Sequence, residues 1–461
     1  MKWHLTFTAL AALGFSASSA GQIPAAVQPL LYELAEAPEA GRIEADIRKL
    51  VSFGTRHTLS ETQSDNHGIG AARRWIKDEF ERISSACGGC LEVSMVSGTV
   101  SGEARIPEPV EVVSVIAIQR GSLDPNRYIM MSGDIDSRVS DVMDAVSDSP
   151  GANDNASGIA GVLEAARILS RHRFAGSIVY AALAGEEQGL FGGQILAEKA
   201  QREGWTVSGI LNNDMIGNIS GIDGIVDNHT VRVFSEGTRA TETADEARLR
   251  RFTGGEVDSP SRNLARYIHR LAGQYMPALD VMLIYRLDRF GRGGHHRPFN
   301  DAGFPGVRLM ETHEHYHRQH QDLRTENGIV YGDTIDGVDF AFAAKATALN
   351  VITLAALSAA PPTPMDVEIE GAVSPDTTLR WQRPAGKAAG NLAGYKLYWR
   401  LTTDPIWTHS RWVGEVTEYT LKNIVIDNYF FGVASVAKDG SESPVVFPGP
   451  AGAFPPGGNG Q

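Results

Sequence analysis

Two aspartates one residue apart mark a position where this chain could do chemistry. They lie in the segment SGDIDSR, residues 132–138, directly after the apolar run YIMM. Side chains two residues apart on a strand point to the same face, so Asp134 and Asp136 can serve one site. Two close carboxylates without a cation repel each other, and one of them stays protonated. The spacing therefore indicates a site that holds a cation.

More acids follow other apolar runs. Asp154 lies in GANDNASG, Glu186 and Glu187 end the run SIVYAALAGEE, and Asp214 follows GILNN. Asp154 is equally compatible with a helix N-cap, and the other acids with solvated loop positions. Glu186 and Glu187 are adjacent and point in different directions. One of them can therefore bind a cation while its neighbour handles a proton.

Histidines are concentrated in one short part of the sequence. Six of the 13 histidines fall between residues 295 and 320: His295, His296, His313, His315, His317 and His320. Aspartate, glutamate and histidine together are the ligand set of a site with one or two zinc ions. Histidines of this segment that bind no metal would be solvated or structural.

The elements that must position these residues form an alternating pattern. Strand-like apolar runs at 110–118, 128–133, 177–185 and 209–217 alternate with helical runs at 155–169 and 190–200. Further helices are expected at 40–54 and 67–84. The alternation predicts an α/β fold with a mostly parallel twisted sheet and helices on both faces. In such sheets the sites lie at the carboxyl ends of the strands, where the acids occur.

A Pro-rich break separates a second part of the chain. A helical run at 338–358 ends the first domain, residues 21–359, and AAPPTP supplies a linker at 360–365. Short alternating strands over 366–449 then predict a β-sandwich, followed by a flexible tail at 450–461. The alternative is that these strands form an extra layer of the first domain.

Composition and the N-terminal residues exclude several classes of protein. The 461 residues carry 42 Lys and Arg against 55 Asp and Glu, a net charge of -13 without a basic stripe, so nucleic acid is not an expected partner. Residues 1–20 resemble a secretory signal peptide, which predicts a secreted or periplasmic protein; the alternative is a buried N-terminal helix. No later stretch is expected to span a membrane.

The chain has two cysteines, Cys87 and Cys90, in the segment ACGGC. This spacing occurs in redox-active pairs and in half zinc sites, but no second CxxC is present. An exported chain meets an oxidising environment. A small structural disulfide is therefore the favoured interpretation.

In their order along the chain, these motifs resemble the M28 zinc aminopeptidases. The resemblance covers roughly residues 40–358 and rests on GDIDSR, GANDNASG, AGEEQGLFG, NNDMIG and ETHEHYHRQHQD. It implies two zinc ions bridged by Asp154, with Glu186 as the general base. Glu187 would bind the first ion and Asp214 the second, and Asp136 would orient a metal ligand.

The sequence departs from the family pattern at two ligand positions. Asp134 stands where the family has histidine, which adds negative charge at the second ion and implies a shifted ion, another metal such as manganese, or a weakly filled site. Asp136 then has no imidazole to orient. The last ligand is either His317 or His320, and the resemblance favours His317, because it follows a tyrosine as the ligand of the family does. His296 matches the family's DHxPF segment, whose residues line the substrate pocket.

The C-terminal strands resemble a fibronectin type III domain. The resemblance rests on Trp381, the strand GYKLYWR and the segment NYFFGVASVAKDGSES. Such a domain implies binding to polymer or protein surfaces, or a removable module that serves secretion or stability. Fold alone does not choose between these roles.

The resemblance implies an exported aminopeptidase that acts on peptide or protein substrates. A metal-bridged water would attack the peptide bond next to a free amino terminus, with Glu186 as the base. The same scaffold also implies three alternatives: a carboxypeptidase, a one-zinc glutaminyl cyclase or an inactive binding protein. A serine hydrolase is not expected, because the sequence contains no GxSxG.

Overall fold

The computed structural model describes residues 23–454. The predicted signal peptide, residues 1–20, and the end of the predicted tail, residues 455–461, lie outside the described residues.

An eight-stranded sheet forms the centre of the first domain, in the order β1-β2-β4-β3-β5-β8-β6-β7. The strands are β1 (Leu91–Val100), β2 (Val110–Gln119), β3 (Asp124–Asp134), β4 (Gly176–Leu183), β5 (Thr206–Asn213), β6 (Thr230–Ser235), β7 (Asp280–Ile284) and β8 (Gly306–Glu311). The four central strands β4, β3, β5 and β8 are parallel. The predicted α/β fold class is confirmed.

One run predicted among the parallel strands has the opposite direction. β2 pairs antiparallel with both β1 and β4. Only residues 120–123 connect β2 to β3, whereas a parallel crossover needs a dozen or more residues. The short connection makes the chain reverse its direction between these two strands.

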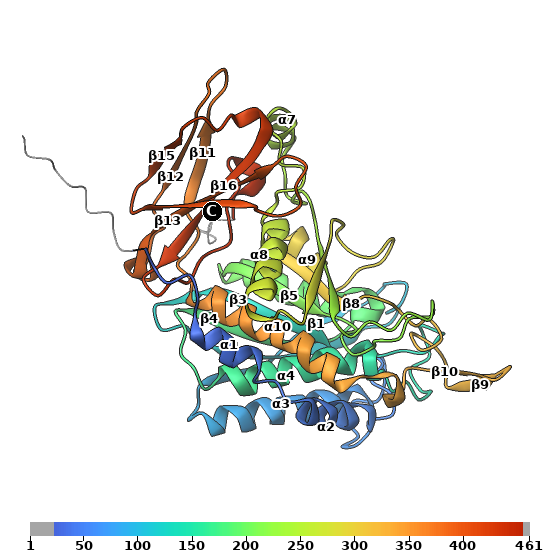
Figure 1. Cartoon of the computed structure of the whole chain (residues 1–461). Helices are drawn as coiled ribbons and strands as arrows, with labels where there is room; N and C mark the ends of the chain where they lie inside the picture. The colour runs from blue at the N-terminus through green and yellow to red at the C-terminus, as the bar shows by residue number, and fades with distance from the viewer. Residues whose placement is uncertain (1–22, 455–461) are drawn as a thin grey trace, which may run out of the picture.

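Helices cover both faces of the sheet. Their bounds are α1 (Pro29–Ala35), α2 (Ala40–Val51), α3 (Gly68–Ala86), α4 (Gly158–Leu169), α6 (Phe191–Arg202), α8 (Pro260–Tyr275), α9 (His296–Asp301) and α10 (Phe340–Ala359). Residues of α2, α3, α4, α8 and α10 share one core cluster, and residues of α6 and α9 share the other. Figure 1 shows α10, α4, α3 and α2 layered on one side of the sheet.

Side-chain alternation in β3 produces these two cores. Ile129 and Met131 lie in the first cluster, and Tyr128 and Met130 lie in the second. Successive side chains of a strand point to opposite faces, so a strand covered on both faces is apolar throughout. This burial explains why the run YIMM shows no alternation of polar and apolar residues.

The helix α10 corrects the prediction that no later stretch is long and apolar enough to cross a membrane. Its length and composition suffice for a membrane span, yet 83% of the apolar 18-residue window is buried inside the protein. A helix that is apolar all round packs in a core as readily as in a bilayer. In this structure α10 is a core helix.

The C-terminal strands form two antiparallel sheets that are separate from the central sheet. The strands are β11 (Met365–Glu370), β12 (Thr377–Gln382), β13 (Leu392–Leu401), β14 (His409–Gly414), β15 (Glu418–Leu421) and β16 (Tyr429–Ala437). One sheet has the order β11-β12-β15 and the other β14-β13-β16, with a core cluster of their own. These sheets are not an extra layer of the central sheet. The fibronectin type III assignment stays a prediction.

The sandwich packs against α8 of the first domain (Figure 1). The guanidinium of Arg400, on β13, donates to both carboxylate oxygens of Asp258 at 2.9 and 2.8 Å, and both side chains are fully buried. Tyr267 and Arg266 of α8 bond the backbone oxygens of Glu442 and Pro405, at 2.9 and 2.8 Å. The contact between the two domains is thus polar, buried and specific.

Residues 450–454, which follow the sandwich, contact the first domain. Arg239 donates to the carbonyl oxygen of Pro450 at 2.8 Å, and Gly452 is buried. For these five residues the contact corrects the prediction of a flexible tail from residue 450.

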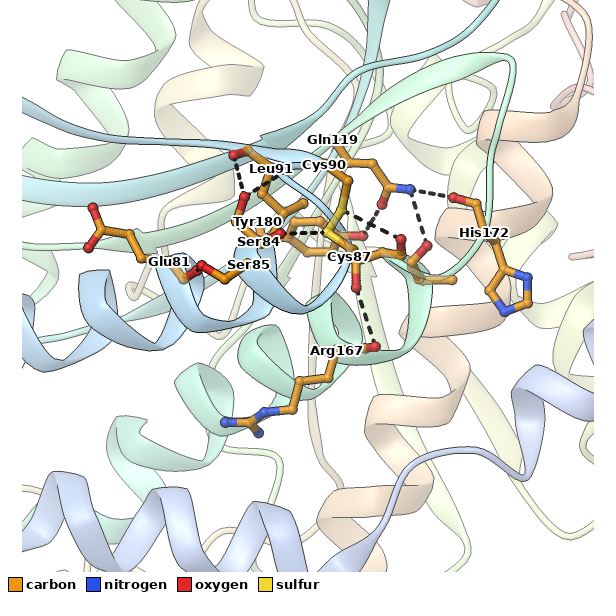
Figure 2. Close-up of a disulfide and its surroundings, with 12 residues drawn as sticks. Glu81, Ser84, Ser85, Cys87, Cys90, Leu91, Gln119, Arg167, His172 and Tyr180 are labelled. Carbon is orange, nitrogen blue, oxygen red and sulfur yellow. Dashed lines mark hydrogen bonds between the residues drawn. A yellow bond between two sulfur atoms is a disulfide. The ribbon is translucent and has the colours of Figure 1, made fainter.

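Figure 2 shows the bond between Cys87 and Cys90, which closes the turn from α3 to β1. The two glycines between the cysteines have φ values of 78° and 85°, a region that glycine adopts without strain. Ser84 donates from its hydroxyl to the carbonyl oxygen of Leu91 at 2.9 Å, across the same turn. The predicted disulfide is confirmed.

Candidate metal centre

The carboxyl ends of β4, β3 and β5 lie side by side and bring the predicted acids to one edge of the sheet. Asp134 is the last residue of β3 and stands opposite Leu183 of β4. Glu186 follows β4 and Asp214 follows β5 within a few residues. Strand ends at one edge are the usual position of a site in an α/β protein.

Three side chains form a group that can hold a metal ion. One ligand atom each of Asp154, Glu187 and His320 lies within 4.8 Å of the others. His320 Nε2 is 2.9 Å from a carboxylate oxygen of Asp154 and 2.9 Å from one of Glu187. One imidazole nitrogen and two carboxylates leave a fourth position open for water, the arrangement of a catalytic zinc site. These residues therefore fit the zinc ion that the sequence predicts.

The structure separates the two candidate histidines. His320 joins the group with Asp154 and Glu187, whereas the ring of His317 packs against Tyr331 with centroids 4.9 Å apart. His317 is therefore not brought to the metal centre. The segment ETHEHYHRQHQD holds several histidines at close spacing, and only the path of this loop decides which one faces the acids.

A buried carboxylate that the sequence analysis missed holds the loop of Asp154. Asp333 accepts hydrogen bonds from the backbone N–H groups of Asn153 and Asp154, at 2.9 and 2.7 Å. Burial raises the pKa of Asp333 to about 7, although both N–H groups oppose the shift. Asp333 lies in a loop far along the chain, and no local pattern marks it.

Asp136 holds the backbone that carries the two glutamates. Its carboxylate accepts hydrogen bonds from the N–H groups of Glu186 and Glu187, at 3.1 and 3.0 Å, and from the hydroxyl of Thr58 at 2.9 Å. The resemblance implied that Asp136 orients a metal-binding imidazole. Its contacts correct this role, because Asp136 positions the start of the short helix α5 (Glu186–Gly189).

Glu186 lines a cavity beside the centre, which has a volume of about 850 Å³. Among residues 23–454, no side chain forms a hydrogen bond or an ion pair with its carboxylate. Burial raises the pKa of Glu186 well above its usual value, and the nearby charges of Glu187 and Asp214 raise it further. A carboxylate with a raised pKa and no partner is suited to accept a proton.

An arginine from the SGDIDSR segment lies against the metal-binding group. Arg138 Nε donates to Glu187 at 2.8 Å, and its Nη2 lies 2.6 Å from His320 Nδ1. Burial opposes the charge of Glu187, but His320 and Arg138 lower the pKa of this carboxyl below its usual value. Glu187 is therefore a carboxylate at neutral pH.

Asp134 contacts a histidine and an amide. Its Oδ1 lies 2.6 Å from His295 Nδ1, and its Oδ2 accepts from the Asn155 side-chain amide at 2.6 Å. Burial raises the pKa of Asp134 and lowers the pKa of His295 to about 4. One proton shared between the two side chains satisfies both shifts. The structure does not bring Asp134 to the metal-binding group, and the nearby charge of Asp136 further raises the pKa of Asp134.

Asp214 is paired with a buried arginine. Arg308 Nη2 lies 2.6 Å from Asp214 Oδ2, and Arg308 Nη1 donates to Asp288 at 3.0 Å. The side chain of Arg308 is 0% exposed. Burial disfavours its charge, but Asp214 and Asp288 raise the pKa of the guanidinium above its usual value. A charged residue in the middle of the apolar strand GVRLME is a signal that could have identified Arg308 from the sequence.

His296 does not line the cavity. Its ring is 0% exposed, and its Nε2 lies 2.9 Å from the carbonyl oxygen of Leu287. The prediction that His296 contacts substrate is corrected by this position inside the protein. The wall of the cavity carries five arginines instead: Arg105, Arg138, Arg289, Arg292 and Arg297.

The comparisons with known proteins agree with a metallopeptidase. Residues 114–336 match the model of peptidase family M28. A probable zinc metalloprotease of Leptosphaeria maculans is 45% identical over 431 residues, covering 93% of this chain and 99% of that protein. Another, of Pyricularia oryzae, is 43% identical over 417 residues, covering 89% of this chain and 83% of that protein.

Solved structures of two Legionella pneumophila proteins have a similar fold. The LapA aminopeptidase superposes with a TM-score of 0.54 at 17% identity, covering 76% of this chain and 78% of that one. LapB superposes with a TM-score of 0.52 at 19% identity, covering 71% of this chain and 74% of that one. At these identities the likeness concerns the fold.

Proposed function

Because the chain belongs to peptidase family M28 and is a zinc-dependent hydrolase, we propose that it is an aminopeptidase, which hydrolyses peptide bonds next to free amino termini. The observation that carries the proposal is the position of Glu186. This carboxylate lies in the cavity wall beside the group of Asp154, Glu187 and His320, and no other side chain among the described residues binds it.

Different residues of the chain have different roles in hydrolysis. Zinc bound by Asp154, Glu187 and His320 would supply a Lewis acid and a water of lowered pKa. Glu186 accepts the proton of the attacking water and passes it to the leaving amine. Asp136 keeps Glu186 in place by binding its backbone N–H at 3.1 Å.

Acids in the cavity wall suit a substrate with a free ammonium group. Asp154, Glu186 and Asp214 all line the cavity. A charge-assisted hydrogen bond to a carboxylate is stronger than a neutral one, so an N-terminal ammonium is favoured over a blocked terminus. This contact would determine that cleavage starts at the amino end.

We expect Glu186→Gln to lower kcat by about 10²–10⁴-fold while leaving the zinc content unchanged, since the amide cannot accept the proton. The matched control is Glu198→Gln, which changes an exposed glutamate of α6 in the same cavity wall and should keep most of the turnover. Turnover is measured with aminoacyl chromogenic substrates, and zinc by mass spectrometry. Normal turnover in Glu186→Gln would contradict the proposed base.

One observation favours a second candidate function. Five arginines line the cavity, and arginine binds carboxylates in a bidentate geometry. A carboxypeptidase would use such a residue to hold the terminal carboxylate of its substrate. Peptides with either end blocked separate the two functions: amino-terminal acetylation abolishes cleavage by an aminopeptidase, and carboxyl-terminal amidation abolishes cleavage by a carboxypeptidase.

We further propose that the protein is exported. The signal-like residues 1–20 and the Cys87–Cys90 disulfide support this localisation. N-terminal sequencing of protein from the culture medium or periplasm should give a mature chain that starts at residue 21. A full-length chain retained in the cytoplasm would contradict export.

A further inference from the structure

We propose that the centre holds a single zinc ion and that the buried guanidinium of Arg308 takes the place and the charge of a second ion. The inference rests on the proposed zinc-dependent function and concerns the same edge of the sheet. It departs from the expectation of two ions bridged by Asp154.

A second ion would need its own set of protein ligands. Such an ion would bind Asp154 together with Asp134 and Asp214. Both carboxylate oxygens of Asp134 are already engaged, one with His295 Nδ1 and the other with the amide of Asn155, each at 2.6 Å. Asp134 is also outside the group of side chains whose ligand atoms lie close enough together to hold one ion.

Asp214 is already paired with a cation of the chain. Its Oδ2 lies 2.6 Å from Arg308 Nη2. Its Oδ1 is buried and has no hydrogen-bond partner among the described residues. Among the described residues, no group of three acids or histidines around Asp214 brings its ligand atoms within 4.8 Å of one another, whereas catalytic zinc sites use three protein ligands. The ligand set for a second ion is thus incomplete.

The fixed positive charge of Arg308 opposes a second cation at Asp214. Arg308 is 0% exposed, and Asp214, Asp288 and the carbonyl oxygen of Gly293, at 2.9 Å, hold it in one position. A divalent ion at Asp214 would lie a few ångströms from this fixed cation. Both charges would lie in the protein interior, where the effective dielectric constant is lower than in water, so their repulsion is strong. The cation that neutralises Asp214 is already part of the chain.

Arg308 is accordingly a positioning residue of the centre. Arg308 does not line the cavity, but it contacts Asp214, which does. The arginine belongs to β8, which pairs with β5 so that Arg308 stands opposite Asn212, two residues before Asp214. This register places the guanidinium at the end of β5.

Zinc stoichiometry tests the inference without reference to activity. Purified full-length protein is saturated with zinc, excess metal is removed, and bound zinc is counted by elemental analysis and native mass spectrometry. We expect one zinc ion per chain. Two tightly bound ions per chain would overturn the inference.

Variants of Asp214 and His320 give a matched comparison. Asp214→Asn should still bind one ion per chain, because Asp214 pairs with Arg308 rather than with zinc. His320→Ala should fall from one ion to none. A loss of one bound ion in Asp214→Asn would assign Asp214 as a ligand and overturn the inference.

Removal of the arginine provides the converse test. In Arg308→Met, Asp214 loses its buried cation, and we expect the folded variant to bind a second zinc ion weakly, through Asp154 and Asp214, at zinc concentrations that leave the wild type with one ion. A folded variant that still binds one ion would overturn the role given to Arg308. Should this variant fail to fold, the wild-type count and the Asp214→Asn count still decide.

The outcomes also separate this inference from the proposed function. A chain that binds one zinc ion but cleaves no peptide contradicts the aminopeptidase activity and leaves the inference standing. A chain that cleaves free amino termini with two bound ions supports the aminopeptidase activity and contradicts the inference.

Discussion

At the scale of single residues, buried cations of the chain neutralise part of the acidic cluster. Arg138 contacts Glu187, Arg308 contacts Asp214, and the loop of Asp154 accepts a bond from Arg56 to the carbonyl of Gly151 at 2.9 Å. The sequence analysis expected a bound cation beside the close carboxylates. The contacts of Arg138 and Arg308 show that side chains of the protein supply part of this positive charge.

The contact between Asp134 and His295 joins two departures from the family pattern. Asp134 stands where the family has histidine, and His295 stands where the segment DHxPF has aspartate. The two side chains are 2.6 Å apart. A histidine and an aspartate are therefore both present at this contact, with their positions in the sequence exchanged.

Asp333 provides a test of how the loop of Asp154 is held. We expect Asp333→Asn to weaken zinc binding by about 10–100-fold, because the amide cannot accept both N–H groups of Asn153 and Asp154 as well as a carboxylate does. The nearby exposed Asp336 supplies the control, and Asp336→Asn should bind zinc normally. Competition with a zinc chelator measures the affinity. Equal zinc affinity in both variants would remove this role from Asp333.

Glu236 links the stability of the fold to pH. Burial raises its pKa from 4.5 to about 7, although the hydroxyl of Ser261 opposes the shift. A carboxyl with a raised pKa stabilises the fold while it is protonated, and this contribution is lost as the pH rises from about 4.5 through about 7.

We therefore expect Glu236→Gln to be more stable than the wild type at pH 8, by about 2 kcal/mol, with a gain that shrinks towards pH 5. The amide keeps an acceptor for Ser261 and carries no charge. Urea unfolding at the two pH values measures the difference. A gain of the same size at both values would mean that ionisation of Glu236 is not its cause.

At the scale of elements, the strand ends explain why residues far apart in sequence meet. β4, β3 and β5 are parallel neighbours, so Glu186, Asp134 and Asp214 come to the same edge. The apolar runs were sufficient to predict these strands, because a strand buried on both faces leaves a continuous apolar segment. The reversed direction of β2 followed from the length of a connection, which the pattern of apolar residues does not contain.

The disulfide between α3 and β1 is an element-scale constraint without a part in the chemistry. Cys87 and Cys90 are three residues apart, and closing so short a loop stabilises the fold by about 2 kcal/mol at most. We expect Cys87→Ala/Cys90→Ala to lower the free energy of unfolding by no more than that. Its kcat should equal that of the wild type; a large loss of kcat in the folded variant would give these sulfurs a further role.

At the scale of the whole molecule, the sandwich and the catalytic domain share a buried ion-pair network. Asp258 accepts from Arg400 of the sandwich and from Arg266 of α8, at 2.8 and 2.7 Å. A chain cut after the linker would leave Asp258 with only one of its two cations. The sandwich is therefore better described as a structural part of the enzyme than as a removable module.

Arg400 offers the corresponding test. We expect Arg400→Ala to lower the free energy of unfolding by about 3–5 kcal/mol, because it leaves a buried carboxylate short of a partner. Arg248→Ala, at an arginine of α7 (Ala244–Thr253) that is 72% exposed, should change stability by less than about 0.5 kcal/mol. Denaturant unfolding compares the two variants. Equal effects would show that the interface contributes little.

The sequence by itself determined the fold class, the helices α2, α3 and α10, the disulfide and the acids at the strand ends. These features depend on local patterns: apolar periodicity, a Pro-rich break, short cysteine spacing and polar residues that end apolar runs. The family resemblance added the expected roles of these acids.

Only the tertiary structure decided that His320 rather than His317 faces Asp154, that Asp134 pairs with His295, and that Arg308 binds Asp214. Each of these contacts joins segments distant in sequence, and its geometry depends on loop paths and strand register. Coulomb and hydrogen-bond energies change steeply over one or two ångströms. A sequence pattern specifies residue types and spacing, and those distances exist only once the chain has folded.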